Sequence, residues 1–88
     1  MPYIKQDERT PFFKSLENLP EFNSAGHLNY YLTKVVHKYL DDRRGENYSA
    51  NYQAMNDVMG ALEGCKLELY RQKIAPYEDI KIAENGNV

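Results

Sequence analysis

The sequence predicts an all-α domain, an antiparallel helical hairpin formed by residues of about 24–42 and about 49–74. In both segments apolar residues recur three and four positions apart, which is the spacing of one face of an α-helix. A short charged stretch with a glycine separates them, and a connection of about seven residues suits antiparallel neighbours. A short N-terminal helix and extended, docked termini complete the expected fold, a single domain over residues 1–88.

The N-terminal residues combine one apolar pair with charged side chains. Residues 1–10 are expected to form an extended arm that docks on the body or on a neighbouring subunit. Thr10 is a suitable N-cap, and Pro11 a suitable first residue, for a short helix that ends near Leu19. Pro20 cannot continue that helix and therefore marks its end.

The first helix of the hairpin is expected to begin after Asn23 or Ser24, since both side chains are good N-caps. Its apolar positions at helical spacing are Leu28, Leu32, Val35, Val36, Tyr39 and Leu40. Gly45, in the charged run DDRRGE, is the expected C-terminal stop.

The second helix of the hairpin has Ser49 as its expected cap and Pro76 as its expected end. On a helical wheel of about 100° per residue, one broad face gathers Met55, Met59, Leu62, Leu69 and Ile74. The following tail, residues 75–88, is too polar for a core helix. Alternation of Ile80 and Ile82 predicts a short strand or an extended docking segment there.

Two glycines interrupt this second helix, although each interior glycine costs about 1 kcal/mol relative to alanine. Gly60 and Gly64 are four residues apart and therefore open the same side of the helix to a close neighbour. The apolar residues also extend over more of the circumference than one partner helix can cover. We therefore expect the protein to form a homo-oligomer.

Composition narrows the possible functions. The net charge of −2 argues against a duplex nucleic-acid partner, but not against a small anionic ligand held by two or three bases. A lone cysteine, Cys65, allows no internal disulfide, and we expect a small packed residue in a reducing compartment. No segment looks like a signal peptide or reaches the roughly 20 apolar residues of a membrane span. The expected location is the cytoplasm, with no membrane association.

Polar side chains lie inside the apolar face of the second helix. Asn56, Glu63 and Lys66 share that face, and Asn29 lies on the apolar side of the first helix, where we expect it to be partly buried. The four residues predict a polar layer between the helices. This layer could be structural and fix the register of the hairpin, or it could form the floor of a ligand pocket.

A nucleotide is one ligand that such a pocket could hold, with cations on its phosphates and tyrosine rings against its base. His37 would be the acid–base candidate, although no nucleophile or paired carboxylate stands beside it in sequence. The full set of candidate ligand-binding residues is Asn29, Tyr30, His37, Tyr52, Asn56, Glu63, Lys66, Tyr70 and Arg71.

An enzymatic role is not predicted. The all-helical NTP pyrophosphohydrolases resemble this chain in size and helix content, but they bind Mg²⁺ through an E-E-x-x-E helix answered by E-x-x-D on a second helix. Here Glu63 and Glu68 are five residues apart and lie on different faces. The two histidines have no metal-ligand spacing, so neither a metal site nor a cofactor is expected.

Several blocks of the sequence resemble a family of small helical proteins of unknown function. They are the opening MPYI, the segment from Gly26 to Tyr30, the stretch from Asn51 to Arg71, and the tail PYEDIKIAENGNV. The resemblance transfers no catalytic residue. Because that family is found in bacteriophage and bacterial genomes, the resemblance implies small oligomers that blunt host defence from within the host cytoplasm.

Two functions remain open from the sequence. One is a non-enzymatic oligomer that sequesters a small anionic ligand such as a nucleotide immune signal. The alternative is a protein–protein interaction module that binds a host or viral protein. A small nucleotide hydrolase is less favoured than either.

Overall fold

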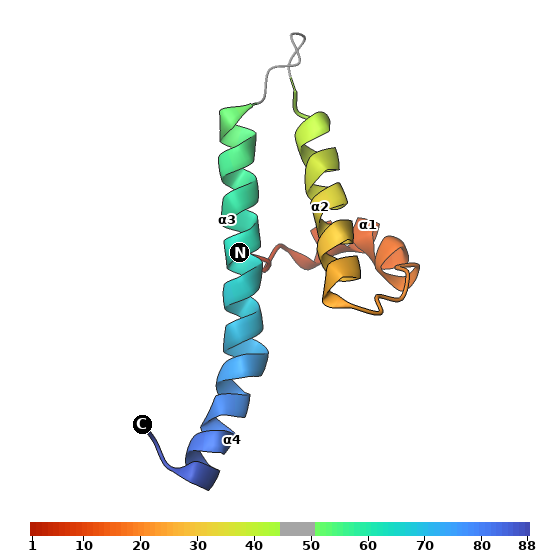
Figure 1. The fold of residues 1–88 in the computed structure, drawn as a ribbon. Coiled ribbons are helices and arrows are strands. Elements are labelled where there is room, and N and C mark those ends of the chain that lie inside the picture. Colours follow the sequence, from red (N-terminus) through yellow and green to blue (C-terminus); the bar gives the residue numbers. More distant parts are fainter. Residues whose placement is uncertain (45–50) are drawn as a thin grey trace. The chain divides into compact units, whose positions relative to one another are not determined.

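The computed structural model describes residues 1–44 and 51–88, and these residues form helices and connecting segments without a strand (Figure 1). The elements in chain order are α1 (Gln6–Glu17), α2 (Ala25–Asp41), α3 (Tyr52–Leu69), the π-helical turn η1 (Tyr70–Ile74) and α4 (Ala75–Asn85). The all-α prediction is therefore confirmed. The expected stop at Gly45 and the expected cap at Ser49 lie outside the described residues.

The chain divides into two compact units. One consists of Tyr3–Val58, and the other consists of Met1–Pro2 together with Met59–Val88. Tyr3–Val58 contains α1, α2 and the first turns of α3, and the second unit contains the rest of α3, η1 and α4 (Figure 1).

Helix α1 begins earlier than predicted. Residues 6–10 are helical, so the prediction of an extended arm over residues 1–10 is wrong for residues 6–10. The prediction of Thr10 as the N-cap is also wrong, because Thr10 lies inside the helix. Asp7 and Glu8 occupy the first turn, where negative charge is favourable at the N-terminal end of a helix. Pro11 lies inside α1 and removes one backbone donor without ending the helix.

Helix α2 begins at one of the two predicted caps and ends at Asp41, within one residue of the predicted range. Ser24 is the N-cap, and its Oγ accepts a hydrogen bond from the backbone N–H of His27 at 3.1 Å. Before this cap, the chain is held against α2 by the Phe22 and Tyr31 rings, whose centroids lie 5.2 Å apart in an edge-to-face arrangement. Side-chain chemistry therefore determines where α2 begins.

Replacing Ser24 by alanine should remove this cap and lower the free energy of unfolding by about 1 kcal/mol. For a domain of this size, that loss corresponds to about 4–8 °C in the thermal midpoint measured by circular dichroism. Ser15→Ala is the matched control, because the Ser15 hydroxyl is exposed and only donates to the Phe12 carbonyl within α1. Equal midpoints for the two variants would contradict the capping role.

Helix α3 is capped by Asn51, whose side-chain oxygen accepts from the Ala54 backbone N–H at 3.2 Å. Among the described residues, Ala54 and Val58 are the apolar residues that are buried. Both belong to Tyr3–Val58. Because they are four residues apart, they lie on the same side of α3, and that side of its first turns is buried.

The prediction that the second helix ends at Pro76, with an extended tail, is wrong. The chain passes from α3 through η1 directly into α4, which ends at Asn85, with Pro76 in the first turn of α4. The Ala75 backbone N–H donates to the Tyr70 carbonyl, five residues back, so the helix widens immediately before the proline. A proline has no N–H and clashes with the carbonyl four residues before it, and a widened turn relieves that clash.

Replacing Pro76 by alanine should therefore remove the steric clash that η1 relieves. We expect the Ala75 N–H to change partner from the Tyr70 carbonyl to the Arg71 carbonyl, and the free energy of unfolding to rise by about 1 kcal/mol. Scalar couplings across hydrogen bonds, measured by NMR, report the change of partner. A π-helical turn that survives the substitution would mean that another residue causes it.

Candidate functional site

Asn29 does not lie in a buried layer. The residue is exposed, and its side-chain oxygen accepts from the Thr33 hydroxyl at 3.2 Å, while the same hydroxyl donates to the Asn29 backbone carbonyl at 2.8 Å. The prediction that Asn29 is partly buried is therefore wrong. The physical reason is that Thr33, one turn later on α2, supplies the amide with a local partner, so no contact from another helix is needed.

The other candidates on α2 and the start of α3 are also exposed. The Tyr30 ring is 66% exposed and has the Lys34 ammonium 5.8 Å from its centroid, a cation–π contact at the protein surface. His37, Tyr52 and Asn56 are exposed as well. These side chains are available to a ligand.

The candidates beyond residue 58 lie along one helical surface. The Lys66 ammonium is 3.8 Å from the Glu63 carboxylate, and the two side chains form an ion pair one turn apart. Both side chains are more than half exposed, so the pair contributes little to stability. Tyr70 is exposed, and the Arg71 guanidinium lies 3.6 Å from the Glu68 carboxylate.

The nine candidate residues fall into two groups. Five belong to Tyr3–Val58, namely Asn29, Tyr30, His37, Tyr52 and Asn56, and four belong to the second unit, namely Glu63, Lys66, Tyr70 and Arg71. Within the second unit, the structure brings Glu63 and Lys66 into contact. The choice between a ligand site and a structural layer stays open.

A shallow groove that the sequence reasoning missed lies in the second unit. Its volume is about 480 Å³, and its surface is mainly apolar. The lining residues come from the N-terminal dipeptide and from one side of the helix, and they are Met1, Pro2, Ala61, Cys65, Glu68, Leu69, Gln72 and Lys73.

Cys65 lines this groove and is exposed, so the prediction of a packed cysteine is wrong. Glu68 is the half-buried acid of the groove. Its side chain is 21% exposed and accepts from the Gln72 amide at 3.4 Å. The groove offers apolar surface with one paired carboxylate, which suits binding of an apolar side chain.

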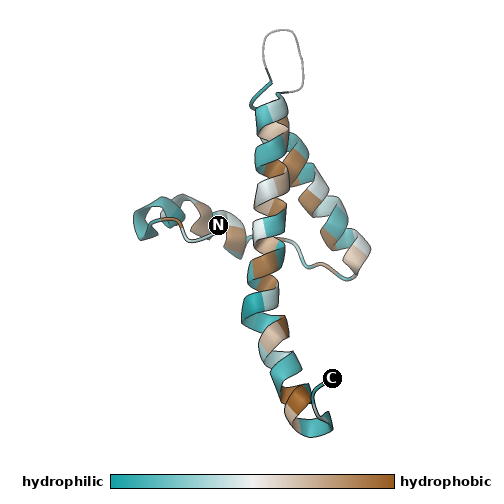
Figure 2. Cartoon of the chain, turned by 90° about the vertical axis from the view of Figure 1, so that its left-hand side faces the viewer, coloured by the Kyte–Doolittle hydropathy of each residue, from teal (hydrophilic) through white to brown (hydrophobic). Residues whose placement is uncertain are grey.

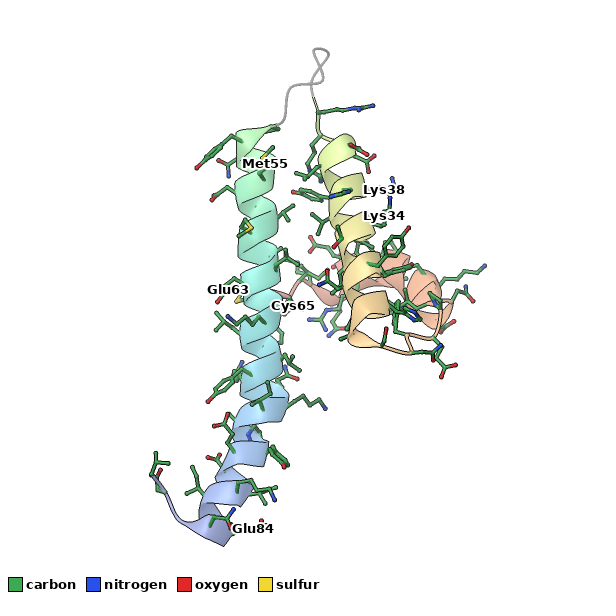
Figure 3. All side chains as sticks on the ribbon, viewed as in Figure 1. Lys34, Lys38, Met55, Glu63, Cys65 and Glu84 are labelled. Carbon is green, nitrogen blue, oxygen red and sulfur yellow. The ribbon has the colours of Figure 1, made fainter. Side chains whose placement is uncertain are left out.

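A sequence signal for this side of the helix does exist. Ala54, Val58, Ala61 and Cys65 follow one another at intervals of four, three and four, which is the spacing of one helix face. The larger apolar residues of the predicted face, Met55 among them, are exposed instead (Figure 3). The prediction followed the larger side chains, whereas the buried residues of this helix are the smaller Ala54 and Val58.

Two further properties bear on the site. In the described part of the chain, no three His, Cys, Asp or Glu side chains are grouped so that they could hold a metal ion. No described helix combines the length and the apolar character that crossing a membrane requires.

Comparison with known proteins gives one result. No curated protein and no solved structure matches this sequence. One family does match, over residues 1–88, and its description is "Domain of unknown function (DUF6899)". The resemblance to a family of unknown function, drawn from the sequence blocks above, is confirmed to that extent. The chain belongs to the DUF6899 family.

Proposed function

We propose that this protein is a non-enzymatic binding protein that acts through exposed helix faces and works as an oligomer. One observation carries the proposal, namely that most of the large apolar side chains stay exposed. Ala54 and Val58 are the buried apolar residues of the described chain, whereas Phe12, Leu16 and Met59 are each more than half exposed.

Exposed apolar surface of this extent is typical of a protein that buries it against a binding partner. Isolated helices are marginal in water, and most helical stability in proteins comes from packing an apolar face. Figure 2 shows hydrophobic residues recurring along the helices that precede residue 45 and along those that follow residue 50. Burial of these residues by other copies of the chain, or by a host or viral protein, would supply the packing.

Sedimentation velocity and native mass spectrometry of the full chain test this proposal. We expect a stable species with at least two chains at micromolar concentration. A helical, thermally stable monomer under the same conditions would overturn it. A turnover assay with nucleoside triphosphates and Mg²⁺ is expected to show no activity, and activity abolished by Glu63→Gln would contradict the non-enzymatic role.

A second candidate function is the binding of a small anionic ligand, such as a nucleotide immune signal in a phage-infected cell. Its support is that the Lys66 ammonium and the Arg71 guanidinium are about three-quarters exposed and lie on successive turns with Tyr70. A thermal-shift panel of linear and cyclic nucleotides tests this, with Tyr70→Ala as the site variant. We expect stabilisation that the variant loses, and no stabilisation by any nucleotide would overturn the ligand proposal alone.

A further inference from the structure

Gly60 has no role within the described structure. A Cβ atom built at Gly60 meets nothing within 4 Å, whereas one at Gly64 lies 3.5 Å from the Met1 backbone nitrogen. The close approach of the N-terminus accounts for Gly64. A glycine inside a helix costs about 1 kcal/mol relative to alanine, so the open space at Gly60 is unexplained unless another chain approaches it.

The side of the helix that carries Gly60 also carries an exposed leucine. Leu67 follows Gly60 by seven residues, two helical turns, and is 57% exposed. Glu63 lies one turn after Gly60 and Arg71 one turn after Leu67, and both charged side chains are more than half exposed. All four residues belong to the unit formed by Met1–Pro2 and Met59–Val88.

We propose that this surface, the Gly60–Leu67 face, binds the same face of a second copy in antiparallel orientation, with the two-fold axis at Leu67. The inference rests on the proposed function, because it names the surface through which the oligomer forms. In this arrangement each residue of one copy lies opposite the residue of the second copy that is equally far from Leu67 in the other direction along the sequence. Gly60 then meets the end of η1 at Ile74 and Ala75, where its missing side chain leaves room for the other backbone.

Charge selects this orientation. Glu63 and Arg71 are each four residues from Leu67, on opposite sides of it, so an antiparallel pair places each Glu63 against an Arg71 of the second copy. A parallel pair would place Glu63 against Glu63 and Arg71 against Arg71, and like charges at an interface are destabilising. Within one chain Glu63 pairs with Lys66 at 3.8 Å and Arg71 pairs with Glu68 at 3.6 Å. The Glu63 and Arg71 side chains are themselves more than half exposed, so both can reach a second copy.

Charge reversal in the full chain tests the pairing. Glu63→Arg alone and Arg71→Glu alone should each raise the dimer dissociation constant at least tenfold by sedimentation equilibrium. An equimolar mixture of the two variants should associate as tightly as the unmodified chain, because every contact is then between opposite charges. The exposed Lys81–Glu84 pair of α4, 3.2 Å apart, provides the control, since Lys81→Glu and Glu84→Lys should leave association unchanged.

Disulfide trapping tests the position of the axis, in a Cys65→Ser background that removes the native thiol. Leu67→Cys chains should form disulfide-linked dimers under mild oxidation. Gly60→Cys chains should not, because the two copies of residue 60 would lie about 21 Å apart along the helices. Efficient linkage of Gly60→Cys chains would overturn the antiparallel arrangement.

A larger side chain at position 60 provides the third test. Gly60→Leu should strengthen the isolated helix, since leucine is the better helix former, yet it should abolish association by filling the point of closest approach. Retained helicity by circular dichroism excludes misfolding as the cause. A chain that is monomeric throughout would refute the proposed function as well. An oligomer that tolerates Glu63→Arg, Arg71→Glu and Gly60→Leu would refute only this face.

Discussion

Replacing Val58 by aspartate is expected to destabilise the Tyr3–Val58 unit by about 3 kcal/mol, among the largest effects of any single substitution in the chain. Val58 is 9% exposed, and Ala54, one turn earlier, is 2% exposed. A carboxylate at position 58 would lose most of its contact with water, and burying a charge is costly. Loss of this buried position should lower the stability of the Tyr3–Val58 unit.

Thermal unfolding followed by circular dichroism measures this effect, and we expect the midpoint to fall by about 10 °C or more. Asn56→Asp is the matched control, because it adds the same charge at an exposed position of the same helix. That control should stay within about 0.5 kcal/mol of the unmodified chain. Similar losses for the two variants would mean that Val58 does not belong to the packed face.

Dilution is expected to destabilise the folded protein, because the helix from α3 to α4 has no buried residue beyond Val58 among the described residues. A helix without packing is marginal in water, so its stability should depend on association with another copy. For a dimer, a hundredfold dilution removes about 2.7 kcal/mol from the folded state. Two chains that unfold together would then lose about 5–10 °C in the thermal midpoint.

Calorimetry over a hundredfold range of protein concentration measures this dependence. The Gly60→Leu variant sharpens the experiment, since its midpoint should be low and should not change with concentration. A midpoint of the unmodified chain that stays constant over the same range would show that one chain folds without a second.

Several helix boundaries were predictable because they depend on neighbours in sequence. The Ser24 hydroxyl bonds to a backbone N–H three residues later, and Pro20 comes shortly after the end of α1. The prediction that Pro11 opens a helix and the prediction that Pro76 ends one were both wrong. In α1 the helix lost only one backbone donor, and before α4 the chain widened into η1 and continued.

The candidate site was predicted less well, because periodicity identifies faces of a helix but does not say which face is covered. Met55 and Leu62 have the larger apolar side chains, and both are exposed, while Ala54 and Val58 are buried. Asn29 was expected to need a partner from the other helix, but the Thr33 hydroxyl supplied one within α2. The smaller side chains, which permit close packing, marked the buried side of the helix, whereas the prediction followed the larger ones.

The sequence by itself determined the all-α class, the ranges of α2 and of the first part of α3, and the cap of α2, since each depends on residues within a few positions of one another. Only the tertiary structure decided which side of α3 is covered and where the N-terminal residues lie. It placed the Met1 nitrogen beside Gly64 and left Gly60 open. Those outcomes depend on contacts between residues far apart in the chain, which the spacing of residues along one helix does not contain.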